Sequence, residues 1–215
     1  TTTLLSNSVS GGTWSSGAPS VASVGASGIV TGITTGIVAI SYAVAGTCGP
    51  SYAIQSVTIN PLPVAGTILG SGFVCVGSSN SLTVGTGGGS WSSSNPSVAT
   101  VSSAGVVAGL ASGTVNISYT VTNSCGTAVA TKAVTVNAVP VVASTSGLLS
   151  ICPSATTLLS NATPAGVWAT GSPSIATVSV SGLVTGISSG TAPISYSVTN
   201  SFGCTTVVVA TVTVN

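Results

Sequence analysis

Short stretches in which apolar and polar residues alternate run along the whole chain. In the clearest of them, Val115–Val121, every second residue is apolar, which is typical of a β-strand with one buried face. Glycine, serine, asparagine and proline separate shorter stretches of the same kind, and helix signals are absent. In the middle third of the chain these are Val74–Val76, Leu82–Val84, Ser90–Ser92, Ala99–Val101 and Gly105–Val107. The pattern predicts an all-β chain.

In the last stretch of the middle third, Ala128–Val136, the apolar side chains would point to one face of the strand in its first half and to the opposite face in its second half. Val129 is out of phase with Val134 and Val136. A β-bulge would return both groups to one face, so we expect a bulge in this strand. Altogether about seven short strands fit between positions 61 and 137, which is typical of a small antiparallel β-sandwich.

Internal repetition divides the chain into three copies of one unit. Six landmarks recur at one constant spacing, the spacing that separates Trp14 from Trp91 and Trp91 from Trp168. This spacing is called the repeat length below. The landmarks are Trp14, Trp91 and Trp168; Pro19, Pro96 and Pro173; Gly28, Gly105 and Gly182; Gly32, Gly109 and Gly186; Gly36, Gly113 and Gly190; and Tyr42, Tyr119 and Tyr196. The spacing slips by a single position around Phe202 and Gly203. We therefore predict three tandem β-sandwich domains at residues 1–60, 61–137 and 138–215, which are named repeats 1, 2 and 3 below.

Two short linkers join the repeats. Asn60–Pro63 and Asn137–Pro140 lie between the last strand of one repeat and the first strand of the next, and both contain proline. Because proline fixes a backbone torsion, these linkers are expected to act as stiff spacers. The domains would then stack as a rod.

Repeat 1 lacks the first strand of the unit, because residues 61–77 have no counterpart ahead of Thr1. A sandwich without an edge strand leaves backbone donors and acceptors unpaired, and such edges recruit other chains. Two alternatives remain: the polypeptide continues upstream as part of a longer protein, or a neighbouring subunit supplies the strand. Upstream continuation is favoured, because the chain ends at Asn215 without a spare strand to donate.

Repeat 2 contains three consecutive motifs, Trp91–Val101 (WSSSNPSVATV), Gly105–Gly109 (GVVAG) and Gly113–Tyr119 (GTVNISY), and repeats 1 and 3 carry matching segments at Trp14–Tyr42 and Trp168–Tyr196. Together they resemble the bacterial Ig-like domain of group 2. The resemblance implies tandem immunoglobulin-like antiparallel β-sandwiches, as found in large bacterial surface proteins, adhesins and some phage tail proteins. It brings no catalytic residue, and the richness in Ser, Thr, Gly and Val is similar to that of secreted proteins of Bacteroidota.

The composition excludes most kinds of site chemistry. The 215 residues contain no Asp, Glu or His, and Lys132 carries the one side-chain charge. Acid–base catalysis and nucleophile activation depend on His or a carboxylate, and calcium, magnesium and zinc sites depend on carboxylates, His or clustered Cys. One lysine is too little for nucleic acid, whose phosphates require clusters of Lys and Arg. We expect no enzyme, no metal site, no cofactor and no nucleic-acid partner.

The apolar residues, 44% of the chain, are scattered among Ser, Thr and Gly. Even the richest window, Ile29–Val44, is repeatedly interrupted by polar residues and glycine, so no membrane-spanning helix is expected. A formal net charge of +1 leaves little repulsion between copies, which favours self-association. A surface of hydroxyls and amides suits an extracellular polymer, so an extracellular or cell-surface location in bacteria is predicted.

The five cysteines fall into two classes. Cys75 and Cys152 are one repeat length apart on the first strand, while Cys48, Cys125 and Cys204 occupy the final hairpin. The recurrence favours one disulfide per complete repeat, Cys75–Cys125 and Cys152–Cys204, each stabilising its domain by about 4 kcal/mol on a chain-entropy estimate. Free thiols in a reducing compartment are the alternative. Cys48 is expected to pair only with a residue outside this chain.

The repeated aromatic residues have two interpretations. The tryptophans could form sugar-stacking platforms, but their repeated setting on a central strand favours a place in the core, and the tyrosines are expected in the core or at its rim. The residues concerned are Trp14, Trp91, Trp168, Tyr42, Tyr119 and Tyr196. Two functions remain: a structural module of an extracellular fibre, stalk or surface filament that binds copies of itself, and an adhesin segment that binds a receptor or glycan.

The absence of acidic residues and histidine leads to a first testable expectation. No side chain except a thiol titrates between about pH 4 and 9, so stability and self-association should stay constant across that range and in about 1 M salt. Analytical sedimentation and thermal unfolding across pH and salt concentration measure both. Dissociation, or a fall in melting temperature, on acidification or in high salt would contradict the expectation and show that ionic contacts hold the assembly.

Overall fold

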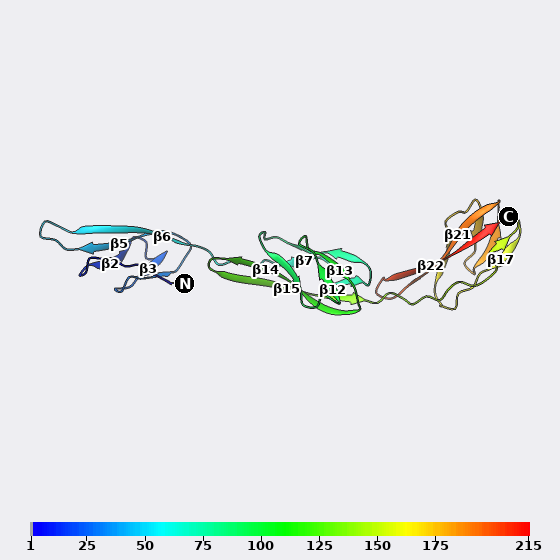
Figure 1. Cartoon of the computed structure of the whole chain (residues 1–215), viewed down its shortest axis with the longest axis horizontal. Helices are drawn as coiled ribbons and strands as arrows, with labels where there is room; N and C mark the ends of the chain where they lie inside the picture. The colour runs from blue at the N-terminus through cyan, green and yellow to red at the C-terminus, as the bar shows by residue number, and fades with distance from the viewer. Residues whose placement is uncertain (1) are drawn as a thin grey trace. The chain divides into compact units, whose positions relative to one another are not determined.

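The structure, a computed structural model, describes residues 2–215, and β-strands are the regular elements of this part of the chain (Figure 1). The prediction of an all-β fold is confirmed. The 22 strands of the described residues are β1 (Thr2–Leu4), β2 (Thr13–Ser16), β3 (Ala22–Val24), β4 (Ile29–Gly32), β5 (Gly36–Val44), β6 (Ser51–Ile59), β7 (Ile68–Leu69), β8 (Phe73–Cys75), β9 (Ser79–Ser81), β10 (Thr83–Val84), β11 (Ser90–Ser93), β12 (Ala99–Val101), β13 (Val106–Gly109), β14 (Gly113–Asn123), β15 (Gly126–Asn137), β16 (Ser150–Ile151), β17 (Thr156–Leu158), β18 (Val167–Thr170), β19 (Ala176–Val178), β20 (Leu183–Gly186), β21 (Gly190–Thr199) and β22 (Thr205–Val214).

The chain forms two compact units. One comprises Thr1–Ile68, Val84–Ser90 and Tyr119–Ala130, and the other comprises Leu69–Thr83, Trp91–Ser118 and Thr131–Asn215. The boundary between the units crosses β14 and β15, so it differs from the predicted ends of repeat 2. The division into domains at residues 1–60, 61–137 and 138–215 stays a prediction, and the repeat names below denote these sequence ranges.

Repeat 1 buries its apolar residues between two three-stranded sheets, β2-β5-β6 and β1-β4-β3. β5 and β6 form a hairpin with unbroken antiparallel register from Gly36 opposite Ile59 to Val44 opposite Ser51. The core between the sheets consists of Ala22, Val30, Val38 and Ile40, with Leu5, Trp14, Ala18, Val21, Val24, Val57 and Ile59 packed against it. Alternate residues of each strand thus face this core, as the period of two requires.

Repeat 3 has the same two layers with one strand more. Its sheets are β16-β22-β21-β18 and β17-β20-β19, and the β21–β22 hairpin, drawn in orange and red in Figure 1, is paired without interruption from Thr199 opposite Thr205 to Gly190 opposite Val214. Its buried core is Ile151, Leu159, Ala176, Val184, Ala192, Ile194, Ala210, Val212 and Val214. Burial of this apolar surface is the main stabilising contribution, since charge pairs cannot form.

In repeats 2 and 3, a short first strand pairs in parallel with the C-terminal end of the last strand. In repeat 2, β8 pairs with β15 so that Cys75 lies opposite Asn137. In repeat 3, β16 pairs with β22 so that Ile151 lies opposite Val214. In the sheet of repeat 1, no described strand pairs with the outer edge of β6. This edge is the one that the sequence predicted to be open.

The predicted bulge in Ala128–Val136 is not needed. Along β15 the residues Ala128, Ala130 and Lys132 are half-buried on the same side as the fully buried Val134 and Val136. Val129, whose phase suggested a bulge, is 57% exposed. Its apolar side chain therefore lies on the solvent side, and the strand alternates without interruption.

A tyrosine in each repeat ties the long hairpin to the loop before the tryptophan strand. The Tyr42 hydroxyl donates to Val9 O at 2.9 Å and accepts from Gly12 N at 2.8 Å. Tyr119 and Tyr196 make the same pair of bonds, to Thr86 O and Gly89 N, and to Thr163 O and Gly166 N. All three tyrosines are at most 7% exposed. Two backbone groups that would otherwise lack partners are thus satisfied inside each repeat.

The glycine of this arrangement is required for space. A Cβ on Gly166 would overlap the ring of Tyr196, and Gly12 and Gly89 have the same relation to their tyrosines. A second close approach surrounds Gly182, where φ is 86° and a Cβ would meet Leu159 O and the Trp168 indole. Glycine therefore allows the aromatic residues to lie directly against the backbone.

Removing the hydroxyl in Tyr196→Phe should lower the stability of repeat 3 by about 1–3 kcal/mol, because Thr163 O and Gly166 N–H lose their partner in a part-buried place. Native-state hydrogen exchange of the β21 amides measures the change. Tyr52→Phe is a matched control, because Tyr52 is 63% exposed and the change there should stay within about 0.5 kcal/mol. Equal effects of the two substitutions would refute a clamping role for Tyr196.

Candidate functional site at the repeat junction

Two kinds of feature, a cluster of metal ligands and a membrane-spanning helix, are absent from the described residues. Within residues 2–215, no three His, Cys, Asp or Glu side chains gather closely enough to hold a metal ion. In the same part of the chain, no helix has the length and apolar character needed to cross a membrane. What recurs instead is a set of contacts between the hairpin of one repeat and the linker that precedes it.

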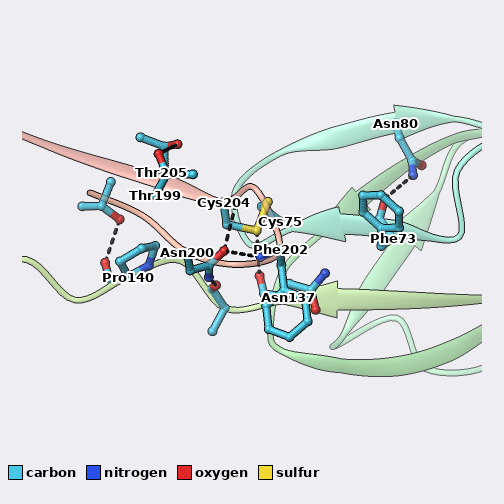
Figure 2. Close-up of a disulfide and its surroundings, with 12 residues drawn as sticks. Phe73, Cys75, Asn80, Asn137, Pro140, Thr199, Asn200, Phe202, Cys204 and Thr205 are labelled. Atoms are coloured by element: carbon cyan, nitrogen blue, oxygen red, sulfur yellow. Dashed lines mark hydrogen bonds between the residues drawn. A yellow bond between two sulfur atoms is a disulfide. The ribbon is translucent and has the colours of Figure 1, made fainter. Parts of the chain in front are cut away.

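A disulfide joins repeat 2 to repeat 3. Cys75, the last residue of β8, is bonded to Cys204, which immediately precedes β22, across 129 residues of sequence (Figure 2). The two Cα atoms are 5.7 Å apart, and Cys204 is only 1% exposed. Both cysteines lie next to Asn137, the residue at which the linker begins.

Neither of the predicted disulfides, Cys75–Cys125 and Cys152–Cys204, is present in the structure. Cys125 and Cys152 are free, as is Cys48. The parallel pairing explains the error: Cys152 follows Ile151, which lies opposite Val214 at the end of β22, whereas Cys204 precedes the start of that strand. About ten extended residues span roughly 30 Å, and a disulfide requires Cα atoms within about 7 Å. β8 and β15 have the same parallel arrangement.

Asn200 organises the junction hairpin of repeat 3. Its side-chain amide donates to Ala138 O at 2.9 Å, and its Oδ1 accepts from the backbone N–H groups of Phe202 and Cys204, both at 3.0 Å. Thr206 Oγ1 donates to Pro140 O at 2.7 Å. Figure 2 shows the bonds of Asn200 beside the disulfide and the bond to Pro140 farther along the linker. The hairpin thus holds the backbone of the linker at two carbonyl groups.

The junction of repeats 1 and 2 shares the asparagine bonds and the hairpin cysteine with the next junction, but has no disulfide. Asn123 Nδ2 donates to Pro61 O at 2.9 Å, and its Oδ1 accepts from Cys125 N at 2.8 Å. The thiol of Cys125 lies 3.7 Å from Asn60 O, and Cys204 Sγ lies 3.9 Å from Asn137 O. Cys125 therefore occupies the position that Cys204 has at the next junction.

The sequence analysis missed the role of these two asparagines. The signal was available, because Asn123 and Asn200 are one repeat length apart and each stands shortly before a hairpin cysteine. Gly46 stands at the corresponding place in repeat 1. An Asx side chain that accepts backbone N–H groups is an ordinary turn former, and only the structure shows that its remaining donor reaches the linker.

The predicted aromatic residues lie close to the cores. Trp14 and Trp168 are half-buried and pack against the cores of their repeats, and Trp91 is also half-buried. The Trp14 and Tyr42 ring centroids are 4.7 Å apart, and those of Trp168 and Tyr196 are 4.6 Å apart. Tyr42, Tyr119 and Tyr196 are buried. None of these three tryptophans is among the exposed residues.

The chain's two phenylalanines are exposed and line a groove beside the disulfide. Phe73 is 59% exposed and Phe202 is 61% exposed. With Gly72, Thr135, Asn137 and Ser201 they surround a hollow of about 420 Å³. Figure 2 shows Phe202 beside the Cys75–Cys204 bond and Phe73 farther to the right. Exposed aromatic rings over a groove are suitable for stacking on a flat ligand.

The chain is similar to a recognised class of bacterial domains. A sequence profile described as bacterial Ig-like domain (group 2) matches residues 78–134 and 150–209, which together make up more than half of the chain. No curated relative matches the chain.

Solved structures give only distant likenesses. Domains 1–6 of the surface layer protein SbsC are 19% identical over 92% of this chain, with a TM-score of 0.27, and this chain spans 32% of that structure. A SusE-like surface-located polysaccharide binding protein from the heparin utilisation locus of Bacteroides thetaiotaomicron is 12% identical over 84% of this chain and 52% of its own, with a TM-score of 0.40. Mouse protocadherin-24 EC1-3 is 11% identical over 99% of this chain and 92% of its own, with a TM-score of 0.34.

The junction bonds lead to an expected effect of Asn200→Asp. Aspartate keeps the acceptor for Phe202 N–H and Cys204 N–H but loses the donor to Ala138 O, so the linker loosens while the turn is retained. Loss of one net hydrogen bond of about 1 kcal/mol should speed reduction of the Cys75–Cys204 disulfide by dithiothreitol about fivefold. Non-reducing peptide mapping should first recover Cys75 joined to Cys204.

Asn116→Asp adds the same charge at an exposed position of β14 and should leave the reduction rate unchanged. Equal acceleration by both variants would assign the effect to charge alone. Recovery of Cys75–Cys125 and Cys152–Cys204 peptides would overturn the described junction.

Proposed function

Because the chain belongs to the family of bacterial Ig-like domains of group 2, we propose that it is a structural module of an extracellular fibre, stalk or surface filament. Its partners are further repeats of the same kind, which associate through uncharged β-sandwich surfaces. The observation that carries the proposal is the disulfide between Cys75 and Cys204, because it links one repeat covalently to the next in addition to the polypeptide.

A bond across a linker has a mechanical consequence. Tension along the chain is shared between the linker backbone and the disulfide, so the junction resists extension without unfolding either repeat. The hydrogen bonds from Asn200 and Thr206 hold the linker carbonyls in place within the same junction. Disulfides persist in oxidising environments outside the cytosol, which supports an extracellular or cell-surface location.

The lack of charge supports association of copies with one another. The net charge of +1 gives almost no repulsion between molecules. Large apolar side chains are exposed on several strands and loops, among them Ile37 at 71%, Ile54 at 67% and Val180 at 96%. Soluble β-proteins commonly protect sheet edges with lysine, and this chain has a single lysine. Burial of such apolar groups between neighbouring copies is the driving force that we propose.

A second candidate function is binding of a glycan or surface receptor. The specific observation in its favour is the groove with Phe73 and Phe202, because aromatic faces stack on sugar rings. In this alternative the repeats form the stalk of an adhesin and the junction groove is the ligand site.

Negative-stain electron microscopy of the purified native material distinguishes the two functions. We expect ordered filaments that persist in about 1 M salt, because apolar burial and backbone pairing are not screened. Reduction of the disulfides should make the filaments more flexible before it dissolves them.

Isolated particles that bind a glycan array, with binding lost in Phe202→Ala, would contradict the filament proposal and support the adhesin. Leu158→Ala serves as the matched control for that variant, because Leu158 is also largely exposed but lies away from the groove.

A further inference from the structure

Two apolar residues at the end of β6 are less buried than their counterparts in the other repeats. Val57 and Ile59 are half-buried in repeat 1. The corresponding residues are Val134 and Val136 in repeat 2 and Val212 and Val214 in repeat 3, and these are exposed by 2% or less. The three pairs share the same sequence setting and strand position. Something that covers repeats 2 and 3 is therefore absent over this face of repeat 1.

The missing cover is the parallel first strand. In repeat 2 a Cβ on Gly109 would meet Cys75 O and Val74, and in repeat 3 a Cβ on Gly186 would meet Cys152 O and Ile151. At Gly32, the counterpart in repeat 1, the three atoms nearest to a Cβ all belong to Ile59. Gly109 and Gly186 are buried, whereas Gly32 is half-buried.

An open groove runs along β6 where this strand lies in the other repeats. One hollow of about 120 Å³ is lined by Gly32, Val57, Ile59, Asn60 and Cys125 among others. A second hollow of about 600 Å³ is lined by residues that include Leu5, Trp14, Ile54 and Val57. The two hollows share Thr3, Val57 and Thr58, so they are parts of one groove. Apolar side chains such as Val57 and Ile59 line it together with hydroxyl and amide groups, and β6 contributes one wall.

We propose that this groove is an acceptor site for an extended segment of the kind found at residues 61–77, supplied from outside the present chain, and that Cys125 captures the cysteine of that segment as a disulfide. The segment lies parallel to β6 and adds a strand to its edge. The proposal extends the proposed function by naming the linkage between repeats, and it does not depend on filament formation.

The chemistry of the occupant follows from the two segments that fill this place in repeats 2 and 3. Residues 61–77 and 138–154 contain no charged residue, and each has a proline near its start and a glycine of positive φ at its middle, Gly70 and Gly147. Two residues before its end, each has a cysteine that follows a buried β-branched residue, Val74-Cys75 and Ile151-Cys152. The groove should therefore reject segments with a charge at the position before the cysteine, because a charge buried there has no partner.

Cys125 is placed to receive this cysteine. The Cys125 sulfur lies 3.7 Å from Asn60 O, and the Cys204 sulfur lies 3.9 Å from Asn137 O. The two cysteines therefore have equivalent positions relative to the linker that precedes their hairpin. At the second junction, Cys204 is bonded to the first-strand cysteine, which lies opposite Asn137. The same register places the cysteine of a segment in the repeat 1 groove opposite Asn60 and next to the Cys125 sulfur.

The bond formation balances as an ordinary thiol–disulfide exchange. The thiolate of Cys125 attacks a small disulfide such as oxidised glutathione, and one glutathione leaves as a thiol. The thiolate of the bound segment then attacks the mixed disulfide and releases the second glutathione. Two protein thiols are oxidised and one small disulfide is reduced to two thiols.

One rule then describes all five cysteines. The first-strand cysteine of one repeat pairs with the hairpin cysteine of the following repeat, as Cys75 does with Cys204. Under this rule the exposed Cys152 is a donor for a hairpin cysteine of a further repeat, and the exposed Cys48 is an acceptor for a first-strand cysteine. The rule replaces the pairing within repeats that the sequence suggested.

The test is to add a copy of residues 61–77 directly ahead of Thr1 in the full chain. Thr1 is the counterpart of Ser78 when the repeats are aligned on their tryptophans, so the addition restores the sequence order of repeat 2. Non-reducing peptide mapping in a glutathione buffer should find the added cysteine joined to Cys125. Cys48 and Cys152 should remain free.

Hydrogen exchange at Thr58 gives an independent readout of strand docking. In repeats 2 and 3 the N–H groups of Thr135 and Thr213 donate to carbonyls of the parallel segment, Gly72 O at 2.9 Å and Leu149 O at 2.8 Å. Thr58 is the counterpart in β6, so its amide should exchange at least about tenfold more slowly once the added segment is seated.

Two variants of the added segment serve as controls. Cys75→Ser in the copy should retain the slow exchange at Thr58 but leave the Cys125 thiol free. Val74→Lys in the copy should abolish both effects, because the lysine cannot be buried in the groove. A synthetic peptide of residues 61–77 added to the unaltered chain tests docking without the tether, which otherwise raises the local concentration.

The proposal is overturned if Cys125 stays free and the exchange at Thr58 is unchanged in both the extended chain and the peptide mixture. It is also overturned if the added cysteine distributes evenly among Cys48, Cys125 and Cys152, since this would be random oxidation. If the extended chain does not fold, the peptide arm decides the matter alone. Filaments that form without strand capture would leave the proposed function in place and remove only this inference.

Discussion

The parallel pairing of the first strand with the far end of the last strand is the constraint on which the junction depends. In the long hairpin of each repeat, the last strand begins at one end of the sandwich and its C-terminal end lies at the other. By pairing with this C-terminal end, β8 and β16 carry their cysteines to the end where the next repeat begins. The hairpin cysteine lies at the opposite end, near the preceding repeat. The two cysteines of one repeat are therefore too far apart to form a disulfide. The first-strand cysteine of one repeat instead lies close to the hairpin cysteine of the next.

The same geometry divides the repeat into two sets of contacts. The tyrosine hydroxyl, its glycine and the tryptophan ring stabilise the interior of each unit, and they recur in all three repeats with equivalent partners. The asparagine, the hairpin cysteine and the linker carbonyls act between units. The junction set is the more variable, since Gly46 replaces the asparagine in repeat 1. Without charged groups, both sets rely on apolar burial and on hydrogen bonds to the backbone.

Much of the fold could be predicted, because the constant spacing of the landmarks and the period of two are both legible in the sequence alone. The strand Val115–Val121 lies inside β14, and Ala99–Val101 is β12 as expected. The errors arose where pairing between distant strands decides the outcome. Val129 resembles a core residue in sequence but is exposed, because the register of a long hairpin fixes its side. The disulfides were misassigned for a related reason: the repeat length shows which cysteines are equivalent, but not at which end of the sandwich each one lies.

The pairing of cysteines that we propose leaves fewer free thiols in an array than in a single repeat of this kind. The closed bond, Cys75–Cys204, has one sulfur partner from each of two successive repeats, so a repeat alone always carries two unpaired half-sites. An exposed thiol in an oxidising compartment exchanges readily with small disulfides, and Cys48 and Cys152 are both exposed. In this pairing each repeat that joins removes two thiols, whereas the edge of the last strand is covered by the first strand of the same repeat. The disulfide therefore acts between repeats and the parallel strand acts within each repeat, and both depend on where the first strand ends.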